Sequence, residues 1–457
     1  RIRRMMMARM RLASRLSARL SRGVSGFGTP LERHGGLFPG IKRLTELVVD
    51  RGAGCRLFTR EGERYLDFTS GIGVLSTGHC HPTVVEAVRE QAGRITHAQQ
   101  SVVYNAAALD LIERLLPVLP SGINTAFFCN SGGEAVENAL RLARQATRKD
   151  TVLCFLGGYH GRTSGALAVT SSSASYRGGR AGPLPSGQVF VPYPYEHAGV
   201  SADDTMRALD AAILQQVGGD DVAGVLIEPI LGEGGYVVPP AGFLSRLREW
   251  CTDRGILLIA DEVQSGFGRT GKMWAVDYED VAPDILISAK GLASGYPLAA
   301  VFAREGVSKM QLANSCGGTY GGNAVACAAA MATLDVFKAE GVLKNVLERG
   351  AQLQAGLRRI GGGADGPLLA DVRGRGLMVA AEFESGAAAY YGLRTSLAVA
   401  ISHACFERGM LLLPTGHRDT LRFVPPLIVS EDEVDECLDI FQEAVKYVTS
   451  SAKEQSL

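Results

Sequence analysis

Five short apolar runs constrain the fold of this 457-residue chain more than any other feature. The runs read TAFF, VLCF, VAGVLI, ILLIA and DILIS, and turn residues bound each of them. None alternates with polar residues, which is typical of strands that are buried on both faces of a parallel sheet. Long stretches with helical spacing separate the runs, so the sequence predicts an α/β fold with a mostly parallel sheet covered by helices.

Segments near both ends of the chain predict a smaller second domain. The segment CRLFTREGERYLDF alternates around Glu61-Gly62 and predicts a hairpin, while LMVAAEF and LRFVPPL predict strands in the last quarter of the chain. We expect a large domain over residues 86–335. We expect a smaller α+β domain that combines residues 31–85 with 336–457.

The first 30 residues differ in composition from the rest. Eight arginines lie between Arg1 and Arg22, interleaved with Met, Leu, Ala and Ser, and the first acidic residue is Glu32. This composition predicts a targeting or disordered segment over residues 1–30, as in a mitochondrial transit peptide, with a native start among methionines 5–7. A chloroplast or cytoplasmic location is the alternative, and a basic tail that binds nothing is the other interpretation.

The remaining composition argues against several classes of protein. Lys+Arg and Asp+Glu both number 47, so no overall charge attracts nucleic acid, and no apolar run approaches the roughly 18 residues of a membrane span. The nine cysteines are scattered singly, which predicts a reducing compartment without disulfides or structural zinc. The only close histidine pair, His79 and His81, predicts a turn at a helix entrance, and no metal site is expected.

Polar residues follow each of the five predicted strands. In chain order they are Ser131-Gly132-Gly133, then Tyr159-His160-Gly161-Arg162, then Glu228 and Glu233, then Asp261, Val263 and Gln264, and finally Lys290. Because ligands of parallel sheets bind outside the carboxyl ends of the strands, these groups predict one site. Any one of them alone would more simply be a cap, a turn residue or a surface charge.

One cofactor accounts for the whole set. Pyridoxal 5′-phosphate needs a lysine amine for its aldehyde, a carboxylate for its pyridinium nitrogen, an aromatic face and a helix N-terminus for its phosphate. Lys290, Asp261, Tyr159 and the turn at Ser131 supply these groups. The small residues after Lys290, in SAKGLASGYP, would leave space for a planar cofactor.

A second glycine-rich stretch, GFGRTGKM at residues 266–273, imitates a nucleotide-binding loop. The phosphate-loop pattern needs a hydroxyl after its lysine, and Met273 has none. Neither a strand directly before this stretch nor a good helix directly after it is predicted. We therefore reject the nucleotide-binding interpretation.

The motifs also resemble a known family, the class III (omega) aminotransferases among the fold-type I pyridoxal phosphate enzymes. The similar segments are NSGGEAVENALRLAR, YHGRTSGALAVT, IEPILGEGG, IADEVQSGFGRTGKMWA, PDILISAKGLASGYPL and GTYGGNAVACAAA. They occur in the family's order, and the resemblance covers nearly everything from about residue 37 onward.

The resemblance implies a role for each cofactor residue. Lys290 would bind the cofactor covalently and shuttle the substrate proton, and Asp261 would pair with the pyridinium nitrogen. Gln264 would bind near the ring hydroxyl. The other implied cofactor contacts are Val263 and Tyr159 on the two ring faces, Ser131, Gly132 and Gly133 at the phosphate, and His160 and Glu228. Thr319 would complete the phosphate site from a neighbouring subunit, which implies a homodimer.

The resemblance also implies how carboxylates are bound. Arg422 would bind the α-carboxylate of a 2-oxo acid, and Glu233 would pair with Arg422 whenever an ω-amino acid is bound. Arg162 would bind the distal carboxylate of 4-aminobutyrate. Ile72 stands where ornithine-specific relatives place a tyrosine, which counts against ornithine.

These implications predict ping-pong transfer of nitrogen from an ω-amino acid, 4-aminobutyrate above all, to 2-oxoglutarate. An acetylornithine or ornithine aminotransferase, or an enzyme that uses pyruvate or glyoxylate, is the alternative within the class. A non-catalytic binding subunit, and a racemase or decarboxylase that keeps the cofactor, are the alternatives outside it. Small amino acids and 2-oxo acids are the expected partners, not nucleic acid or membrane.

Overall fold

The structure, a computed structural model, describes residues 43–178, 182–362, 368–415 and 418–454. The predicted targeting segment, 1–30, lies outside these residues. The chain divides into two compact units, residues 1–51 with 58–63 and residues 52–57 with 64–457. The second unit contains every predicted site residue. The predicted split into large and small domains stays a prediction, and its boundary at 336 falls inside helix α12 (Ala324–Ala339).

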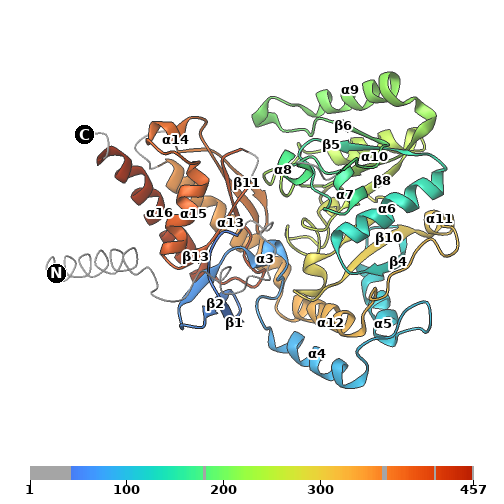
Figure 1. Cartoon of the computed structure of the whole chain (residues 1–457), viewed down its shortest axis with the longest axis horizontal. Helices are drawn as coiled ribbons and strands as arrows, with labels where there is room; N and C mark the ends of the chain where they lie inside the picture. Colours follow the sequence, from blue (N-terminus) through green and yellow to red (C-terminus); the bar gives the residue numbers. More distant parts are fainter. Residues whose placement is uncertain (1–42, 179–181, 363–367, 416–417, 455–457) are drawn as a thin grey trace. The chain divides into compact units, whose positions relative to one another are not determined.

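The second unit contains a seven-stranded sheet with helices around it (Figure 1). Its strands, in spatial order, are β4 (Ile123–Cys129), β10 (Ala299–Arg304), β9 (Ile285–Ser288), β8 (Leu257–Asp261), β7 (Val222–Ile227), β5 (Thr151–Phe155) and β6 (Gln188–Val191). All five apolar runs are strands, and β9, β8, β7, β5 and β6 pair in parallel. The predicted α/β fold with a mostly parallel sheet is therefore confirmed.

Strand β10 is the exception to the parallel order. It pairs antiparallel with both β4 and β9, and it was not predicted from the sequence. Its register sets Ala299 opposite Cys129 and Ala300 opposite Ser288, so the carboxyl ends of β4 and β9 both meet the start of β10. On the other side, Asp261 at the end of β8 pairs with Ile287. The polar loops after the strands consequently leave the sheet at one edge.

Both faces of the sheet are buried, as the unalternating runs require. Ile285 and Ile287 of β9 belong to a core cluster with helix α6 (Gly132–Thr147), whereas Leu286 between them belongs to the cluster that includes helix α10 (Phe243–Asp253). All three β9 side chains are fully buried. Because successive strand residues point to opposite faces, only a continuous apolar run can satisfy both helix layers.

A second, antiparallel sheet carries one of the predicted substrate residues. It has the order β11 (Leu369–Arg375), β12 (Met378–Phe383), β15 (Thr420–Phe423), β14 (Leu413–Pro414). Arg422 of β15 lies opposite Ala380 of β12.

The final helix, α16 (Glu431–Glu454), begins with a capping box. The Glu433 amide donates to Ser430 Oγ at 3.2 Å, and the Ser430 amide donates to the Glu433 carboxylate at 3.1 Å.

The predicted hairpin is present. Strands β2 (Arg56–Thr59) and β3 (Arg64–Asp67) flank a turn in which the Gly62 amide donates to the Thr59 carbonyl at 3.0 Å. Strand β3 also pairs in parallel with β13 (Met410–Leu411), with Leu66 opposite Met410. An early segment of the chain is thereby tied to a late one.

The GFGRTGKM stretch has a structural role. Arg269 is buried, and its Nη1 donates to the carbonyls of Pro425 at 2.6 Å and Leu377 at 3.2 Å. A short 3-10 helix over Ala275–Glu279 follows, and none of residues 266–273 lines the site cavity. The stretch ties two distant segments together, in agreement with its rejection as a nucleotide-binding loop.

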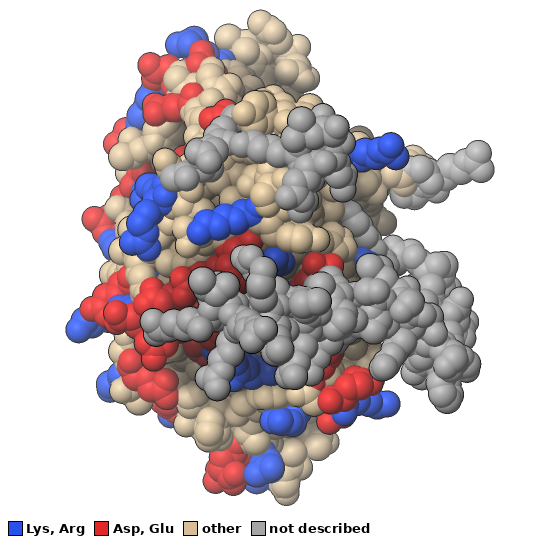
Figure 2. Space-filling model, turned by 90° about the vertical axis from the view of Figure 1, so that its left-hand side faces the viewer, with Lys and Arg blue, Asp and Glu red and all other residues tan. Residues whose placement is uncertain are grey.

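The surface carries charges of both signs. Figure 2 shows acidic and basic side chains interspersed over the face in view. Within the described ranges, no helix is long and apolar enough to cross a membrane, and no group of three His, Cys, Asp or Glu could hold a metal. All nine cysteines are free. His81 caps helix α4 (Pro82–Arg94), as the histidine pair predicted.

Candidate active site

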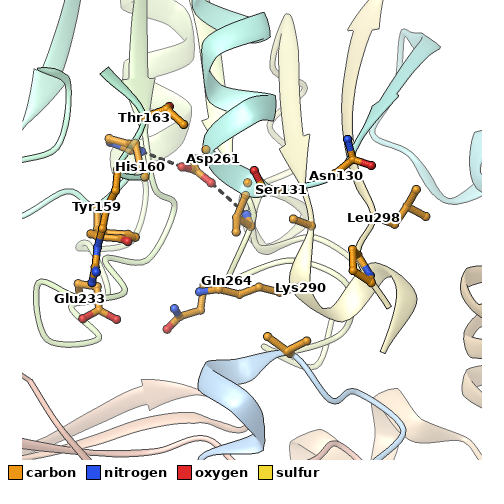
Figure 3. A pocket seen from close by; sticks show the side chains of 18 of the residues that line it. Asn130, Ser131, Tyr159, His160, Thr163, Glu233, Asp261, Gln264, Lys290 and Leu298 are labelled. Carbon is orange, nitrogen blue, oxygen red and sulfur yellow. Dashed lines mark hydrogen bonds and ion pairs between the residues drawn. The ribbon is translucent and has the colours of Figure 1, made fainter. Parts of the chain in front are cut away.

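A cavity of about 690 Å³ opens at the carboxyl edge of the main sheet. Loops that follow β4, β5, β7, β8 and β9 line it, and Figure 3 shows side chains from these loops gathered around one space. The predicted residues among its lining are Ser131, Gly132, Gly133, Tyr159, His160, Arg162, Glu228, Glu233, Asp261, Val263, Gln264 and Lys290. Strand ends far apart in sequence therefore form one site.

Asp261 is fixed at the bottom of the cavity by two hydrogen bonds. One carboxylate oxygen contacts His160 Nδ1 at 2.7 Å, and the other accepts from the Val263 amide at 3.1 Å (Figure 3). Both Asp261 and His160 are buried. Burial opposes protonation of His160, but the hydrogen bond and charge of Asp261 raise its pKa. The pair thus presents an oriented carboxylate to the cavity.

Lys290 reaches the cavity from the turn after β9. It begins the 3-10 turn Lys290–Ala293 with a φ of 39°, a left-handed conformation that residues with a side chain seldom adopt. Such backbone strain gathers at functional sites, where the surrounding structure maintains it. Burial lowers the pKa of the Lys290 amine to about 8. About a tenth of the amine is therefore unprotonated, and nucleophilic, at pH 7, far more than for an ordinary lysine with a pKa of about 10.4.

The pKa of Lys290 predicts a pH dependence. We expect the rate at which the cofactor-free protein binds pyridoxal phosphate covalently to rise with pH through about 8 and then level off, because only the unprotonated amine attacks an aldehyde. Stopped-flow absorbance between about pH 6.5 and 9.5 measures this rate. An ordinary lysine has a pKa of about 10.4. A rate still rising tenfold per pH unit at the upper limit would contradict the lowered value.

The small residues after Lys290 pack against another segment. A Cβ on Gly291 would lie 2.6 Å from Ser76 Oγ, which donates to the Gly291 carbonyl at 3.1 Å. Ser294 Oγ contacts Thr77 at its amide, 2.9 Å, and at its hydroxyl, 2.7 Å. The small size of Gly291 therefore permits this close packing. Ala289 and Gly295 of the same stretch line the cavity, and the interpretation that the small residues leave space for a cofactor stays a prediction.

The turn before helix α6 has a geometry suited to binding an anion. Ser131 caps the helix by accepting from the Glu134 amide at 3.2 Å. Gly132 and Gly133 follow at the helix N-terminus, where backbone amides and the helix dipole favour a phosphate. A Cβ on Gly161 would lie 2.8 Å from the Cα of Gly133, so the loop after β5 closes tightly on this turn.

Glu228 acts on the backbone of two neighbouring loops. Its carboxylate accepts from the amides of Tyr159 at 2.7 Å and Gly232 at 2.8 Å. Burial raises the pKa of Glu228 to about 7. Glu228 was predicted to contact the cofactor; it lines the cavity and also positions both Tyr159 and the turn that leads to Glu233.

Glu233 and Arg422 form an ion pair at the cavity wall. Arg422 Nη1 contacts one carboxylate oxygen of Glu233, and Tyr176 donates to the other at 3.3 Å. Burial alone would raise the pKa of Glu233, but the charge and hydrogen bond of Arg422 lower it. Tyr176 was missed from the sequence, because a lone tyrosine in SSSASYRGG carries no periodic signal.

Three predicted residues do not line the cavity. Arg422 contacts it only through its ion pair with the lining residue Glu233. Thr319 and Ile72 lie elsewhere. Thr319 is exposed, and Ile72 is 44% exposed with a φ of 68°. Neither lines the cavity, so this chain alone does not bring them to the site. The lining instead includes Val74, close to Ile72 in sequence, and Tyr296 and Leu298, which had no sequence signal beyond proximity to Lys290.

The residues present fit pyridoxal phosphate. The cavity combines the Lys290 amine, the Asp261 carboxylate and the free helix end at Ser131. Gln264 Oε1 is buried, and no hydrogen-bond donor within the described residues reaches it, so it can accept from a ring hydroxyl. Each polar feature of the cofactor consequently has a counterpart of suitable chemistry.

Comparisons with known proteins agree with the geometry. Residues 40–445 match the family model of the class III aminotransferases. The 4-aminobutyrate aminotransferase of Escherichia coli is 37% identical over 407 residues, 88% of this chain and 94% of that protein. The 5-aminovalerate aminotransferase of Pseudomonas putida is also 37% identical, with the same coverage. The acetylornithine aminotransferase of Methanopyrus kandleri is 40% identical over 395 residues, 86% and 93% of the two chains.

Solved structures extend the likeness to three dimensions. A transaminase from the marine bacterium Virgibacillus matches with a TM-score of 0.85 at 26% identity, covering 93% of this chain and 99% of that one. The ornithine aminotransferase of Toxoplasma gondii, described with pyridoxal phosphate at its active site, has a TM-score of 0.79 at 30% identity, over 96% and 95% of the chains. The chain therefore belongs to the class III aminotransferases, enzymes that use pyridoxal 5′-phosphate.

Proposed function

We propose that this aminotransferase transfers the amino group of an ω-amino acid, most specifically 4-aminobutyrate, to 2-oxoglutarate in a ping-pong reaction. The observation that carries the proposal is the ion pair between the lining residue Glu233 and the buried Arg422, with the guanidinium of Arg162 among the lining residues. The similarity to the Escherichia coli 4-aminobutyrate aminotransferase supports the same substrate.

The two arginines suit two different substrates at one site. A guanidinium binds a carboxylate through paired, charge-assisted hydrogen bonds. An ω-amino acid has one carboxylate, which would bind Arg162 while Glu233 neutralises Arg422. A 2-oxo diacid has two carboxylates, so its α-carboxylate would replace Glu233 on Arg422. The ion pair therefore allows substrates with one and two carboxylates to alternate.

We further propose the chemical roles of the nearby residues. When bound, the cofactor supplies an electron sink for the carbanion at the substrate carbon. Lys290 Nζ would take the proton from that carbon and return it, a task suited to an amine whose pKa is about 8. Asp261 would hold a proton on the ring nitrogen through its negative charge. Tyr159 and Val263 would enclose the ring, and the turn at Ser131 would bind the phosphate.

We also propose a homodimer in a mitochondrial location. The exposed position of Thr319, outside the cavity of its own chain, supports a role for that residue in the phosphate site of a neighbouring subunit. The arginine-rich composition of residues 1–30 supports the location.

A half-reaction panel tests the proposed substrate. The purified enzyme would be mixed with 4-aminobutyrate, 5-aminovalerate, acetylornithine, ornithine and β-alanine, and the loss of the bound cofactor's visible absorbance would be followed. The fastest loss per unit concentration with 4-aminobutyrate is expected. A faster reaction with acetylornithine would favour that alternative, and regeneration by pyruvate or glyoxylate but not 2-oxoglutarate would overturn the proposed acceptor.

Arg162 gives a sharper prediction. Arg162→Ala is expected to raise the KM for 4-aminobutyrate by about 10- to 100-fold, because a charge-assisted hydrogen bond contributes about 1.5–3 kcal/mol. The KM for an amine without a carboxylate should not change. Arg177→Ala is the matched control, since Arg177 lies over the Phe190 ring and does not line the cavity. Equal effects on both amines would contradict the carboxylate-binding role.

A further inference from the structure

Tyr176 contacts three side chains of the cavity wall without lining the cavity itself. It belongs to the short helix α8 (Ala174–Arg177). Its hydroxyl donates to Glu233 at 3.3 Å, and its ring meets Tyr159 edge to face at 5.3 Å between centroids. The Arg162 guanidinium lies 4.6 Å from the centroid of the Tyr176 ring. Tyr176 therefore touches Tyr159, which is proposed to enclose the cofactor ring, and Glu233 and Arg162, which are proposed to select substrates together with Arg422.

The Glu233 carboxylate is divided between two partners. One oxygen contacts Arg422, and the other accepts from the Tyr176 hydroxyl. The side chains of Arg422 and Glu233 are only 5% and 13% exposed, so water competes little for these bonds. Burial raises the pKa of Tyr176, which therefore stays neutral and able to donate across the working pH range. Each partner consequently stabilises the position in which Glu233 covers Arg422.

The Tyr176 ring acts on Arg162 separately from its hydroxyl. Arg162 is exposed, and a long exposed side chain samples many rotamers unless a partner holds it. A guanidinium over an aromatic face is attracted by the ring quadrupole, and that attraction limits the directions the guanidinium can take. The ring thus holds the proposed carboxylate-binding group, while the hydroxyl holds Glu233.

We propose that Tyr176 is a positioning residue that sets substrate selectivity: its hydroxyl keeps Glu233 on Arg422, and its ring orients Arg162. This inference rests on the proposed function, in which Glu233 leaves Arg422 for a substrate with two carboxylates. In the closed arrangement Glu233 is paired with Arg422, and a ligand that binds Arg422 must first break this pair. The apparent affinity of such a ligand therefore decreases as the population of the closed arrangement increases. Tyr176 therefore weakens the binding of ligands with two carboxylates and favours the binding of the amino donor, which has one carboxylate.

Tyr176→Phe isolates the hydroxyl, because the ring contacts with Arg162 and Tyr159 remain. Loss of one donor to the carboxylate lowers the ratio of the closed arrangement, with Glu233 on Arg422, to the open one by about five- to tenfold. The KM for 2-oxoglutarate is expected to fall by up to that factor, and the KM for 4-aminobutyrate to rise. These opposite shifts, with kcat nearly constant, separate a selectivity role from a structural one, which would worsen both constants together.

Two further variants complete the test. Tyr176→Leu also removes the ring and is expected to raise the KM for 4-aminobutyrate beyond the value of the Phe variant, through Arg162. Tyr195→Phe is the matched control, because Tyr195 donates to the Glu382 carboxylate at 3.0 Å and lies outside the cavity lining. It should change neither KM. A Tyr195→Phe variant with the same opposite shifts would overturn the assignment to Tyr176.

Binding without turnover gives an independent readout. Glutarate has two carboxylates and no reacting group, and butyrate has one carboxylate. Calorimetry should show about fivefold tighter glutarate binding by Tyr176→Phe than by the native enzyme, with butyrate bound no more tightly. Unchanged or weaker glutarate binding would overturn the proposal. If the native enzyme reacts with no ω-amino acid at all, the proposed function fails first, and glutarate binding still shows whether Tyr176 controls Arg422.

Discussion

Replacement of Lys290 by alanine is expected to abolish amino-group transfer, by about 10⁴-fold or more. Among the described residues that line the cavity, Lys290 carries the only amine. The variant would therefore lose both the proposed covalent attachment of the cofactor and the proposed base that moves the substrate proton. Steady-state turnover of 4-aminobutyrate with 2-oxoglutarate measures the loss. Absorbance of the bound cofactor shows whether it is still held through its phosphate.

A second lysine provides the control for this experiment. Lys272 lies in the glycine-rich stretch that imitates a nucleotide-binding loop, and its Nζ donates to the Asp277 carbonyl at 2.6 Å. It does not line the cavity. Lys272→Ala should therefore keep activity within a few-fold of the native enzyme. Sustained turnover by Lys290→Ala without added amines would refute the role of Lys290, and loss of activity only in Lys272→Ala would reverse the two assignments.

Asp261→Asn is expected to lower kcat by about 10³-fold. A carboxylate about 4 Å from a ring cation contributes about 4 kcal/mol at an effective dielectric constant near 20, and asparagine keeps the shape but not the charge. The His160 ring also loses the charge that raises its pKa. Single-turnover kinetics with 4-aminobutyrate, together with the cofactor's absorbance as a function of pH, measure the effect.

The neighbouring carboxylate supplies the matched control. Glu262 is buried, and burial raises its pKa to about 8, so it is largely neutral at pH 7. It accepts from Ser265 Oγ at 2.5 Å and from the Val276 amide at 2.9 Å, and it does not line the cavity. Glu262→Gln should therefore leave kcat nearly unchanged. Similar losses in the two variants would mean that Asp261 acts through folding rather than through its charge.

The core of the fold was predictable because its signal is local. A strand covered by helices on both faces must be apolar at every position, and Ile285 to Ile287 show both faces filled. Strand β10 escaped prediction because it follows closely after the Lys290 turn and the loop 294–298. Its direction could not be predicted because the partners on either side set it. Its antiparallel position between β4 and β9 is a property of the assembled sheet.

The residues of the site show the same difference between what a local sequence pattern predicts and what only the assembled fold determines. Residues at strand ends, such as Asp261 and Lys290, could be placed together from the sequence, since parallel strands end at one edge. Tyr176 could not, because its contacts with Glu233 and Arg162 come from a short helix whose position no local pattern encodes.

The sequence by itself therefore determined the five apolar strands of the main sheet, the edge at which the polar residues gather, and the residue types suited to pyridoxal phosphate. These follow from hydrophobic periodicity and from the geometry of parallel strands. Only the tertiary structure decided that Glu233 covers Arg422, that Tyr176 shares that carboxylate, and that Gly291 is small so that Ser76 can pack against it. Each of these contacts joins segments far apart in the chain, and their distances depend on packing that no local sequence pattern specifies.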